Sequence, residues 1–219
     1  MFHRLLKHVE CPTDSTFTKP TKILKEITEF NPCNIDNLSL ISINIRSIRK
    51  NFNLLLLFLK SIKIPISIIS ICETWLYDGE EQLFNISGYN QYFVNRSNNS
   101  RSGGLIVYVA NHLHSFPMDN LSMIHQFFDS LFIKVFIGNK AHIFGSVYRS
   151  TSNSLTSFIQ SFKVVILDNL PMNLSTICGG FNLNLLNAPS HSGATGGSFR
   201  QNLISPLGSV DYFFNNMDP

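Results

Sequence analysis

Charged residues are scarce in this chain. Asp, Glu, Lys and Arg make up 14% of its 219 residues, against about a quarter in a typical soluble domain. No run of five or six like charges occurs, and the net charge of +3 is compatible with a polyanionic partner without indicating one. Hydrophobic residues make up 44% of the chain, which excludes wholesale disorder and allows a large core. The composition therefore predicts a folded domain of ordinary size.

Cysteine is sparse as well. The four cysteines are Cys11, Cys33, Cys72 and Cys178. They form no C-x-x-C pair and stand beside no histidine that could complete a zinc site. Cys72 and Cys178 lie inside apolar runs, which is typical of buried, reduced cysteines. This pattern favours a reducing compartment.

Long hydrophobic runs and recognisable targeting signals are also missing. The longest apolar stretch, Phe52 to Cys72, is interrupted by Lys60, Lys63 and Pro65, so it does not predict a membrane span. The first residues lack a charged-then-apolar signal sequence. We therefore expect an intracellular protein, cytoplasmic or nuclear, without a membrane partner.

Several common motifs are absent too. The sequence contains no Walker loop, no G-x-S-x-G elbow and no dinucleotide fingerprint, which argues against a small-molecule cofactor. What remains must be interpreted from the order of the predicted strands and helices and from the polar residues at their ends.

The chain divides into a leader and a domain. Residues 1–37 show little apolar periodicity, and we expect them to be a poorly ordered leader. From residue 38 to 219 the pattern predicts one α/β domain. It opens with a strand ending near Ile45, a helix over Ser47–Ser61 and a buried strand over Ile66–Cys72. Because Leu54–Leu59 are apolar all round, we expect the helix to be deeply buried.

The rest of the domain alternates further strands and a helix. A turn at Gly138–Asn139 predicts a hairpin, and a three-to-four apolar spacing predicts a helix over Ser154–Leu170. Residues 188–198 read as a loop. The further predicted strands are Leu105–Ala110, Leu131–Ile137, Ala141–Arg149, Thr176–Cys178 and Val210–Phe214.

Polar residues stand at or near the ends of several predicted strands. They are Asn44, Glu73, Tyr148, Asn182 and Asp211. Chemistry in α/β folds gathers where loops leave the carboxyl ends of strands, and a carboxylate after a buried strand suits Mg²⁺. Each residue also has a structural interpretation: Glu73 as a helix N-terminal charge, Asn44 as a turn residue, Tyr148 as a core aromatic. Taken singly, these interpretations stay open.

Six segments in order resemble those of one family. They are ISINIRSIRKNF around Asn44, IISICETWL around Glu73, RSGGLIVYV, GSVYRS around Tyr148, ICGGFNLNLLN around Asn182, and GSVDYFFNN around Asp211. Together they resemble the endonuclease/exonuclease/phosphatase superfamily, and within it the endonuclease domain of LINE-type (non-LTR) retrotransposons, a relative of apurinic/apyrimidinic endonucleases. The resemblance covers residues 38–216.

The resemblance implies a fold and an activity. The fold would be a four-layered α/β sandwich, two mixed sheets flanked by helices. The activity would be Mg²⁺- or Mn²⁺-dependent nicking of DNA to prime reverse transcription. Glu73 and Asn44 would form the metal site, Tyr148 and Asn182 would position the phosphate, and Asp211 would orient a catalytic histidine.

The sequence departs from the family pattern at three places. Gly180 stands where the family has the aspartate of Gly-Asp-Phe-Asn, and the chain reaches Pro219 without the Ser-Asp-His ending. The stretch between Asn187 and Asp211 is also shorter than expected for the family. We therefore expect a domain that is incomplete at its C-terminus, binds metal weakly and is catalytically impaired. The alternatives are a non-catalytic remnant with weak nucleic-acid binding and an enzyme of the same fold acting on phosphoinositides or sphingomyelin. The Glu-Thr-Trp-Leu and Val-Tyr-Arg segments argue against the lipid enzyme.

Overall fold

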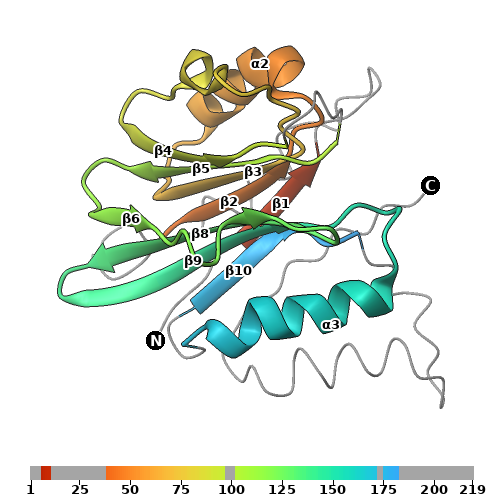
Figure 1. Ribbon diagram of the computed structural model, residues 1–219. Helices are drawn as coiled ribbons and strands as arrows, with labels where there is room; N and C mark the ends of the chain where they lie inside the picture. Colours follow the sequence, from red (N-terminus) through yellow and green to blue (C-terminus); the bar gives the residue numbers. More distant parts are fainter. Residues whose placement is uncertain (1–5, 11–37, 97–101, 172–174, 183–219) are drawn as a thin grey trace, which may run out of the picture.

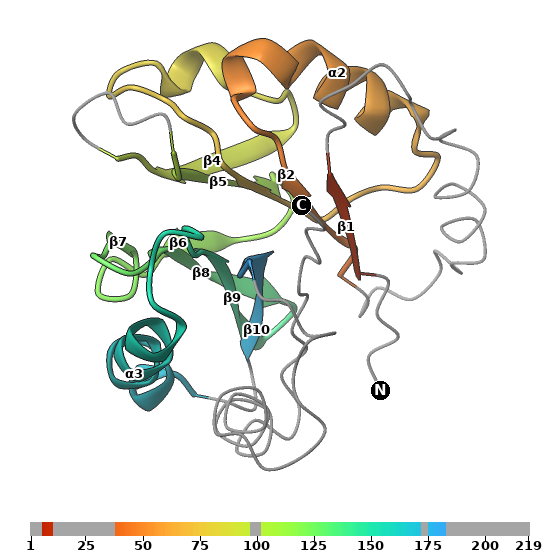
Figure 2. The same ribbon diagram turned by 90° about the vertical axis from the view of Figure 1, so that its right-hand side faces the viewer.

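Two β-sheets lie face to face, with a helix on the outer side of each (Figure 1). The computed structural model describes residues 6–10, 38–96, 102–171 and 175–182. All structural statements below concern these residues. Viewed from the side, the order of layers is α2, first sheet, second sheet and α3 (Figure 2). This confirms the predicted four-layered α/β sandwich.

The first sheet has the strand order β1-β2-β3-β5-β4. Its strands are β1 (Leu6–Glu10), β2 (Leu40–Asn44), β3 (Ile68–Cys72), β4 (Tyr89–Val94) and β5 (Leu105–Ala110). β1, β2 and β3 pair in parallel, whereas β5 runs antiparallel to both β3 and β4. The sheet is therefore mixed, as predicted.

The second sheet has the order β10-β9-β8-β6, and β7 also pairs with β8. Its strands are β6 (Ser115–Pro117), β7 (Met123–Ile124), β8 (Asp129–Ile137), β9 (Lys140–Tyr148) and β10 (Ser175–Gly180). β8 and β9 form the predicted hairpin, and β10 pairs with β9 in parallel. This sheet is mixed as well.

The helices differ in how they are supported. The predicted second helix forms α3 (Leu155–Val165), capped by the Ser154 side chain and followed by the 3₁₀ turn η2 (Leu167–Asn169). α3 buries Phe158 and Phe162 in a cluster with the second sheet. Another 3₁₀ turn, η1 (Glu81–Phe84), lies on the first-sheet side.

The first helix, α2 (Ile48–Ser61), is not deeply buried, so that prediction was wrong. Only Ile48 and Leu55 are buried, seven residues apart on one helical face. The side chains of Leu54 and Leu57 are 44% and 63% exposed. Because Leu54–Leu59 are all apolar, the sequence does not show which side of this surface helix forms its one buried stripe.

The strand over Ile68–Cys72 is buried on both faces, as predicted. Ile69 and Ile71 pack in the cluster below α2, whereas Ile68 and Cys72 face the second sheet. Side chains of a strand alternate between its two faces, so a strand covered on both reads as a continuous apolar run. Cys72 and Cys178 are both buried free thiols.

The N-terminal region contributes one strand to the first sheet. Leu6–Glu10, which the sequence places in the leader, forms β1 and pairs with β2 from Leu6↔Leu40 to Glu10↔Asn44. The rest of the predicted leader, the predicted strand Val210–Phe214 and Asp211 within it lie outside the described residues. Within the described ranges, no helix is long and apolar enough to cross a membrane.

Candidate active site

The carboxyl ends of four strands meet at one edge of the sandwich. β2 and β3 end side by side at Asn44 and Cys72, and β9 and β10 end side by side at Tyr148 and Gly180. β10 packs against β2 and β3 across the space between the sheets. The parallel pairing within each sheet and the packing of β10 on β2 and β3 place Asn44, Glu73, Tyr148 and Asn182 at a common edge, whereas Asp211 lies outside the described residues.

Asn44 and Glu73 are joined directly. Asn44 Nδ2 donates to Glu73 Oε1 at 2.8 Å, and the Arg46 amide donates to Asn44 Oδ1 at 3.3 Å. Both side chains are buried. Glu73 has a positive φ of 57°, which is uncommon for a residue with a side chain, and its carbonyl accepts from the Ser47 amide at 2.9 Å. The carboxylate is thus held by its backbone and by one amide.

Tyr148 reaches this carboxylate from the other sheet. It is the last residue of β9 and is buried. Burial, the charge of Glu73 and a hydrogen bond with that carboxylate raise the pKa of the Tyr148 phenol. The phenol therefore stays protonated at neutral pH and acts as a hydrogen-bond donor. Asn44, Glu73 and Tyr148 form one polar cluster across the two sheets.

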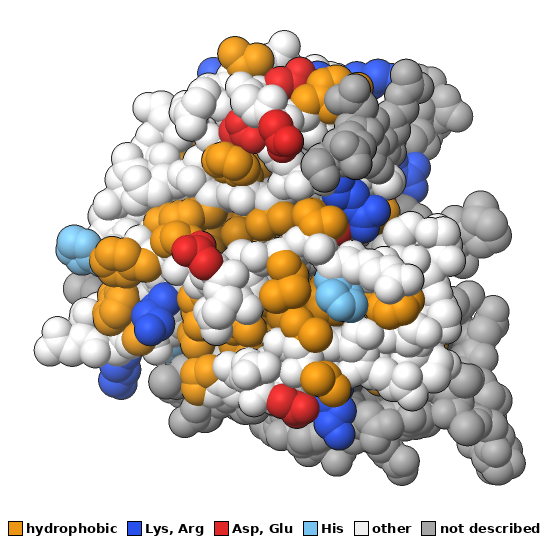
Figure 3. Space-filling view, viewed as in Figure 1, with side chains coloured by type: hydrophobic (Ala, Val, Ile, Leu, Met, Phe, Trp, Pro, Cys, Tyr) orange, Lys and Arg blue, Asp and Glu red, His pale blue; other side chains and the backbone are white. Residues whose placement is uncertain are grey.

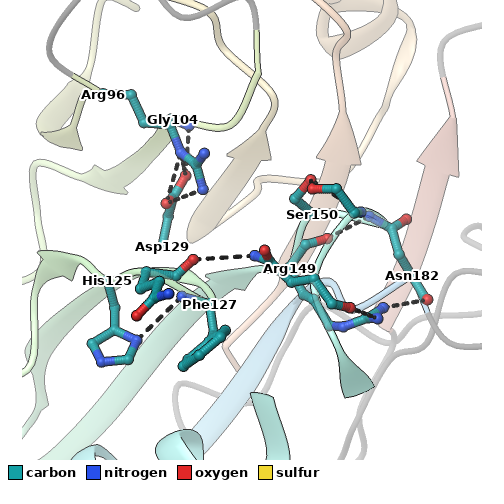
Figure 4. Close-up of polar contacts among 11 residues, drawn as sticks. Arg96, Gly104, His125, Phe127, Asp129, Arg149, Ser150 and Asn182 are labelled. Atoms are coloured by element: carbon teal, nitrogen blue, oxygen red, sulfur yellow. Dashed lines mark hydrogen bonds and ion pairs between the residues drawn. The ribbon is translucent and has the colours of Figure 1, made fainter. Parts of the chain in front are cut away.

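Asn182 lies just beyond β10 and is tied to Arg149 (Figure 4). Asn182 Nδ2 donates to the Arg149 carbonyl at 2.6 Å, and Arg149 Nη1 donates to the Asn182 carbonyl at 2.9 Å. Arg149 Nη2 also donates to the Asn153 carbonyl at 2.5 Å. The Oδ1 atom of Asn182 is buried and has no hydrogen-bond partner in the described structure. Arg149 therefore fixes Asn182 while leaving one acceptor unused.

Gly180 stands beside the Tyr148 ring. The two residues are partners in the β9–β10 register, and a Cβ atom built at Gly180 would lie 3.2 Å from Tyr148 Cδ2. An acid at this position would begin next to the phenol. Gly180 supplies no carboxylate there.

Among the described residues Asn44, Glu73, Tyr148 and Asn182, only Glu73 carries a carboxylate. The described residues contain no group of three or more His, Cys, Asp and Glu residues that could hold a metal ion. Mg²⁺ prefers oxygen ligands and commonly keeps several waters beside one or two carboxylates. Glu73 with the nearby Asn44 amide fits such an ion, with one protein charge to hold it.

Three of the described histidine side chains lie at the far ends of their strands from Glu73. His112 and His114 follow β5 at the edge where β3 begins, because Ile68 pairs with Val109. His142 pairs with Val135 near the start of β9. His125 lies before β8 and stacks on Phe128 with ring centroids 4.7 Å apart. His112, His114 and His142 therefore do not replace the histidine that Asp211 is predicted to orient.

Sequence analysis missed a buried acid at the same edge. Asp129 begins β8 opposite Tyr148 and is completely buried. It forms an ion pair with Arg96, with Arg96 Nη2 2.8 Å from Asp129 Oδ1. Burial raises the pKa of Asp129, and Arg96 opposes that rise. The sequence signal for Asp129 was an acid at the start of an apolar strand. That signal does not identify the partner, because Arg96 lies 33 residues away in the sequence.

Exposed apolar side chains occur on both sheets. Hydrophobic side chains gather on the face that contains β4, β5 and β6 (Figure 3), and Phe93 of β4 and Phe116 of β6 are both exposed. A shallow depression beside β6 is lined by Phe116, Pro117, Met118, Asp119, Asn120, Lys134 and Phe136. None of the site residues described above lines it.

Comparison with known proteins gives a structural match. No family model and no curated protein sequence matches the chain. The endonuclease domain of TRAS1, a telomere-specific non-LTR retrotransposon, aligns with a TM-score of 0.53 at 12% identity, over 78% of this chain and 71% of that one. The AP endonuclease LMAP of Leishmania major aligns with 0.54 at 13%, over 84% and 73%.

A third match is the 3′ phosphatase NExo from Neisseria, solved with a product DNA hairpin. It has a TM-score of 0.52 and 14% identity, over 77% of this chain and 70% of that one. These structures share the endonuclease/exonuclease/phosphatase fold, and this chain has that fold too.

Proposed function

We propose that this chain is a retrotransposon-type DNA endonuclease domain, built for divalent-metal-dependent hydrolysis of a phosphodiester. The observation that carries the proposal is the cluster of Asn44, Glu73 and Tyr148 at the carboxyl ends of strands from both sheets, with Asn182 beyond the adjacent strand. These are residues that the family motifs select, and they come from segments up to 138 positions apart in the sequence, at Asn44 and Asn182.

Each residue has a task in this proposal. Glu73 would hold the ion. Asn44 would fix the Glu73 carboxylate and supply its amide oxygen as a second ligand of the ion. The protonated Tyr148 phenol and the Asn182 amide would orient the phosphate through hydrogen bonds. A bound Mg²⁺ or Mn²⁺ would neutralise charge at the scissile phosphate and at the leaving oxygen.

DNA is the substrate that we propose. The motif resemblance points to a retrotransposon endonuclease, and the fold is shared with the TRAS1 endonuclease domain and with NExo, which was solved with a DNA hairpin. A net charge of +3 supports a polyanionic substrate weakly. An intracellular location, cytoplasmic or nuclear, agrees with this substrate and remains part of the proposal.

Gly180 favours a second candidate, a domain that binds nucleic acid weakly without efficient turnover. The position beside Tyr148 carries no acid to orient water or to add a metal ligand. General acid–base assistance is commonly worth about 10²–10⁴-fold, and a lost electrostatic contact costs on the order of 10²–10³-fold. Such losses are not additive because the residues act as a unit. We therefore propose that this copy is catalytically impaired.

Relaxation of supercoiled plasmid in Mg²⁺ tests the proposal, with wild type, Gly180→Asp and Glu73→Ala compared at equal concentration. We expect wild type to nick near background and Gly180→Asp alone to leave nicking low, since this change adds no catalytic histidine. Robust wild-type nicking that Glu73→Ala abolishes would contradict the impairment and support the endonuclease. Release of phosphate from phosphoinositides, without action on DNA, would overturn the DNA assignment.

A further inference from the structure

A buried ion pair lies at the edge that carries Glu73. Arg96 Nε is 3.0 Å from both carboxylate oxygens of Asp129, and Arg96 Nη2 is 2.8 Å from Oδ1 (Figure 4). Asp129 is completely buried, and the Arg96 side chain is 20% exposed. Replacing such a pair with apolar residues often leaves stability unchanged or improves it. Overall stability is therefore a weak explanation for it.

Asp129 also holds the glycine pair that opens β5. The Gly104 amide donates to Asp129 Oδ2 at 2.9 Å. A Cβ atom at Gly103 would lie 2.3 Å from that same oxygen and 2.5 Å from Arg96 Nε. Both glycines have positive φ, 72° and 80°. The backbone at Gly103–Gly104 is thus pressed against the ion pair in a conformation that favours glycine.

The glycine pair in turn holds the segment that contains Glu73. The Thr74 amide donates to the Gly104 carbonyl and the Trp75 amide donates to the Gly103 carbonyl, both at 3.3 Å. A Cβ atom at Gly104 would lie 2.4 Å from Thr74 Oγ1. Trp75, like Glu73, has a positive φ, 53°. An uncommon backbone conformation of this kind persists only where its surroundings fix it.

We propose that the Arg96–Asp129 pair is a positioning device for Glu73, acting through Gly103–Gly104 on the Glu73–Trp75 backbone. Asp129 is the register partner of Tyr148 and also bonds to Gly104, so it contacts both the strand that carries Tyr148 and the glycine pair that holds the Glu73–Trp75 segment. Its effect on ion binding rests on the proposed function, in which Glu73 holds the metal. The effect of the pair on the Glu73–Trp75 backbone is independent of the proposed function.

The chain contains its own reporter for this backbone. Trp75 is the only tryptophan, two residues after Glu73. We compare the emission of Trp75 and the Mn²⁺ affinity of wild type, Asp129→Asn and Arg96→Met. Asp168→Asn, the same chemical change at an exposed acid in η2, is the matched control. Circular dichroism confirms that each variant is folded at the temperature used.

We expect Asp129→Asn and Arg96→Met to shift the Trp75 emission while folded and to weaken Mn²⁺ binding by about 10–100-fold, as is usual when a group that orients a metal ligand is lost. Asp168→Asn should match wild type. Gly104→Ala leaves both charges in place but crowds Thr74, and should reproduce the emission shift.

Lowered thermal stability with unchanged Trp75 emission and unchanged Mn²⁺ affinity would overturn the inference, because the pair would then be merely structural. Glu73→Gln separates the two proposals. If Glu73→Gln binds Mn²⁺ as wild type does, the metal assignment fails. In that case the Trp75 emission of Asp129→Asn alone decides whether the pair positions the segment.

Discussion

The two halves of the site are built differently. In the first-sheet half, the Asn44 amide and the Glu73 carboxylate satisfy each other at 2.8 Å, and the Glu73 carbonyl is held by Ser47. In the second-sheet half, Asn182 Oδ1 and Arg149 Nε are buried without a hydrogen-bond partner in the described structure. Gly180 adds no side chain there.

This difference separates two tasks. In the half that would hold a metal ion, the Asn44 and Glu73 side chains bond to each other. In the half that would orient the phosphate and water, Asn182 keeps an unused acceptor next to a glycine-ended strand. Thr74 Oγ1 and Trp75 Nε1, beside Glu73, are also buried without a partner in the described structure. A buried polar atom without a partner costs about 1–3 kcal/mol, so a ligand that supplies the missing contacts is the expected occupant. We infer that binding and turnover depend on different residues here.

The largest expected effect comes from removing the support of the second-sheet half. Phe162 stacks on Phe158 with centroids 5.4 Å apart and meets Phe181, the residue between Gly180 and Asn182, at 6.3 Å. Phe162→Ala should lower the free energy of unfolding by about 3–5 kcal/mol because it leaves a cavity. Urea unfolding measures this. Val164→Ala, on the exposed side of α3, should stay within about 0.5 kcal/mol of wild type.

The next effect concerns the first-sheet half. Asn44→Leu removes the amide that donates to Glu73 and should cost about 1.5–3 kcal/mol, as for other hydrogen bonds to charged groups. Asn44→Asp instead places a second carboxylate there, and one of the two pKa values must rise. The stability of Asn44→Asp relative to wild type should therefore be retained at acidic pH and lost as pH rises through that raised pKa. A pH-independent difference between the two proteins would refute this.

Much of this architecture could be predicted from the sequence, because strands buried on both faces read as apolar runs. β3, β5 and the β8–β9 hairpin were found in this way, and with them the strand-end residues Glu73 and Tyr148. The edge strand β4 was missed because its residues are only partly buried and include Asn90 and Gln91. The burial of α2 was misjudged because a run of leucines does not reveal which side faces the sheet.

The supporting contacts of the site could not be predicted. The Arg96–Asp129 pair and the Arg149–Asn182 bonds each join residues 33 positions apart, and no local pattern marks such partners. They arise only when the strand order is known. The role of Asp211 stays a prediction, since this residue lies outside the described part of the chain.

A smaller effect is expected at Asn182, whose φ is 50°. Asn182→Gly and Asn182→Ala both remove the hydrogen bond to the Arg149 carbonyl, but only the alanine variant keeps a Cβ in the left-handed region. The alanine variant should therefore be less stable than the glycine variant by about 1–2 kcal/mol. Thermal or urea unfolding of the pair measures the difference. Equal stabilities would show that the backbone at Asn182 is not constrained as described.

The smallest effect is on the titration of Tyr148. Because the Glu73 charge contributes to the raised pKa of this phenol, Glu73→Gln should lower that pKa, as followed by ultraviolet absorbance during alkaline titration. The raised pKa also means that the Tyr148 contribution to stability is complete below the ordinary tyrosine pKa and is lost as pH rises through the folded-state value. An identical titration of Tyr148 in both proteins would show that the two halves are not electrostatically coupled.

The most direct measurement is a titration of Mn²⁺ or Mg²⁺ into wild type and Glu73→Gln, followed by calorimetry. One carboxylate without an acid at Gly180 should bind the ion weakly, in the millimolar range or above, and Glu73→Gln should remove that binding. Equal binding by the two proteins would contradict the assignment of Glu73 as the metal ligand, and with it the proposed function.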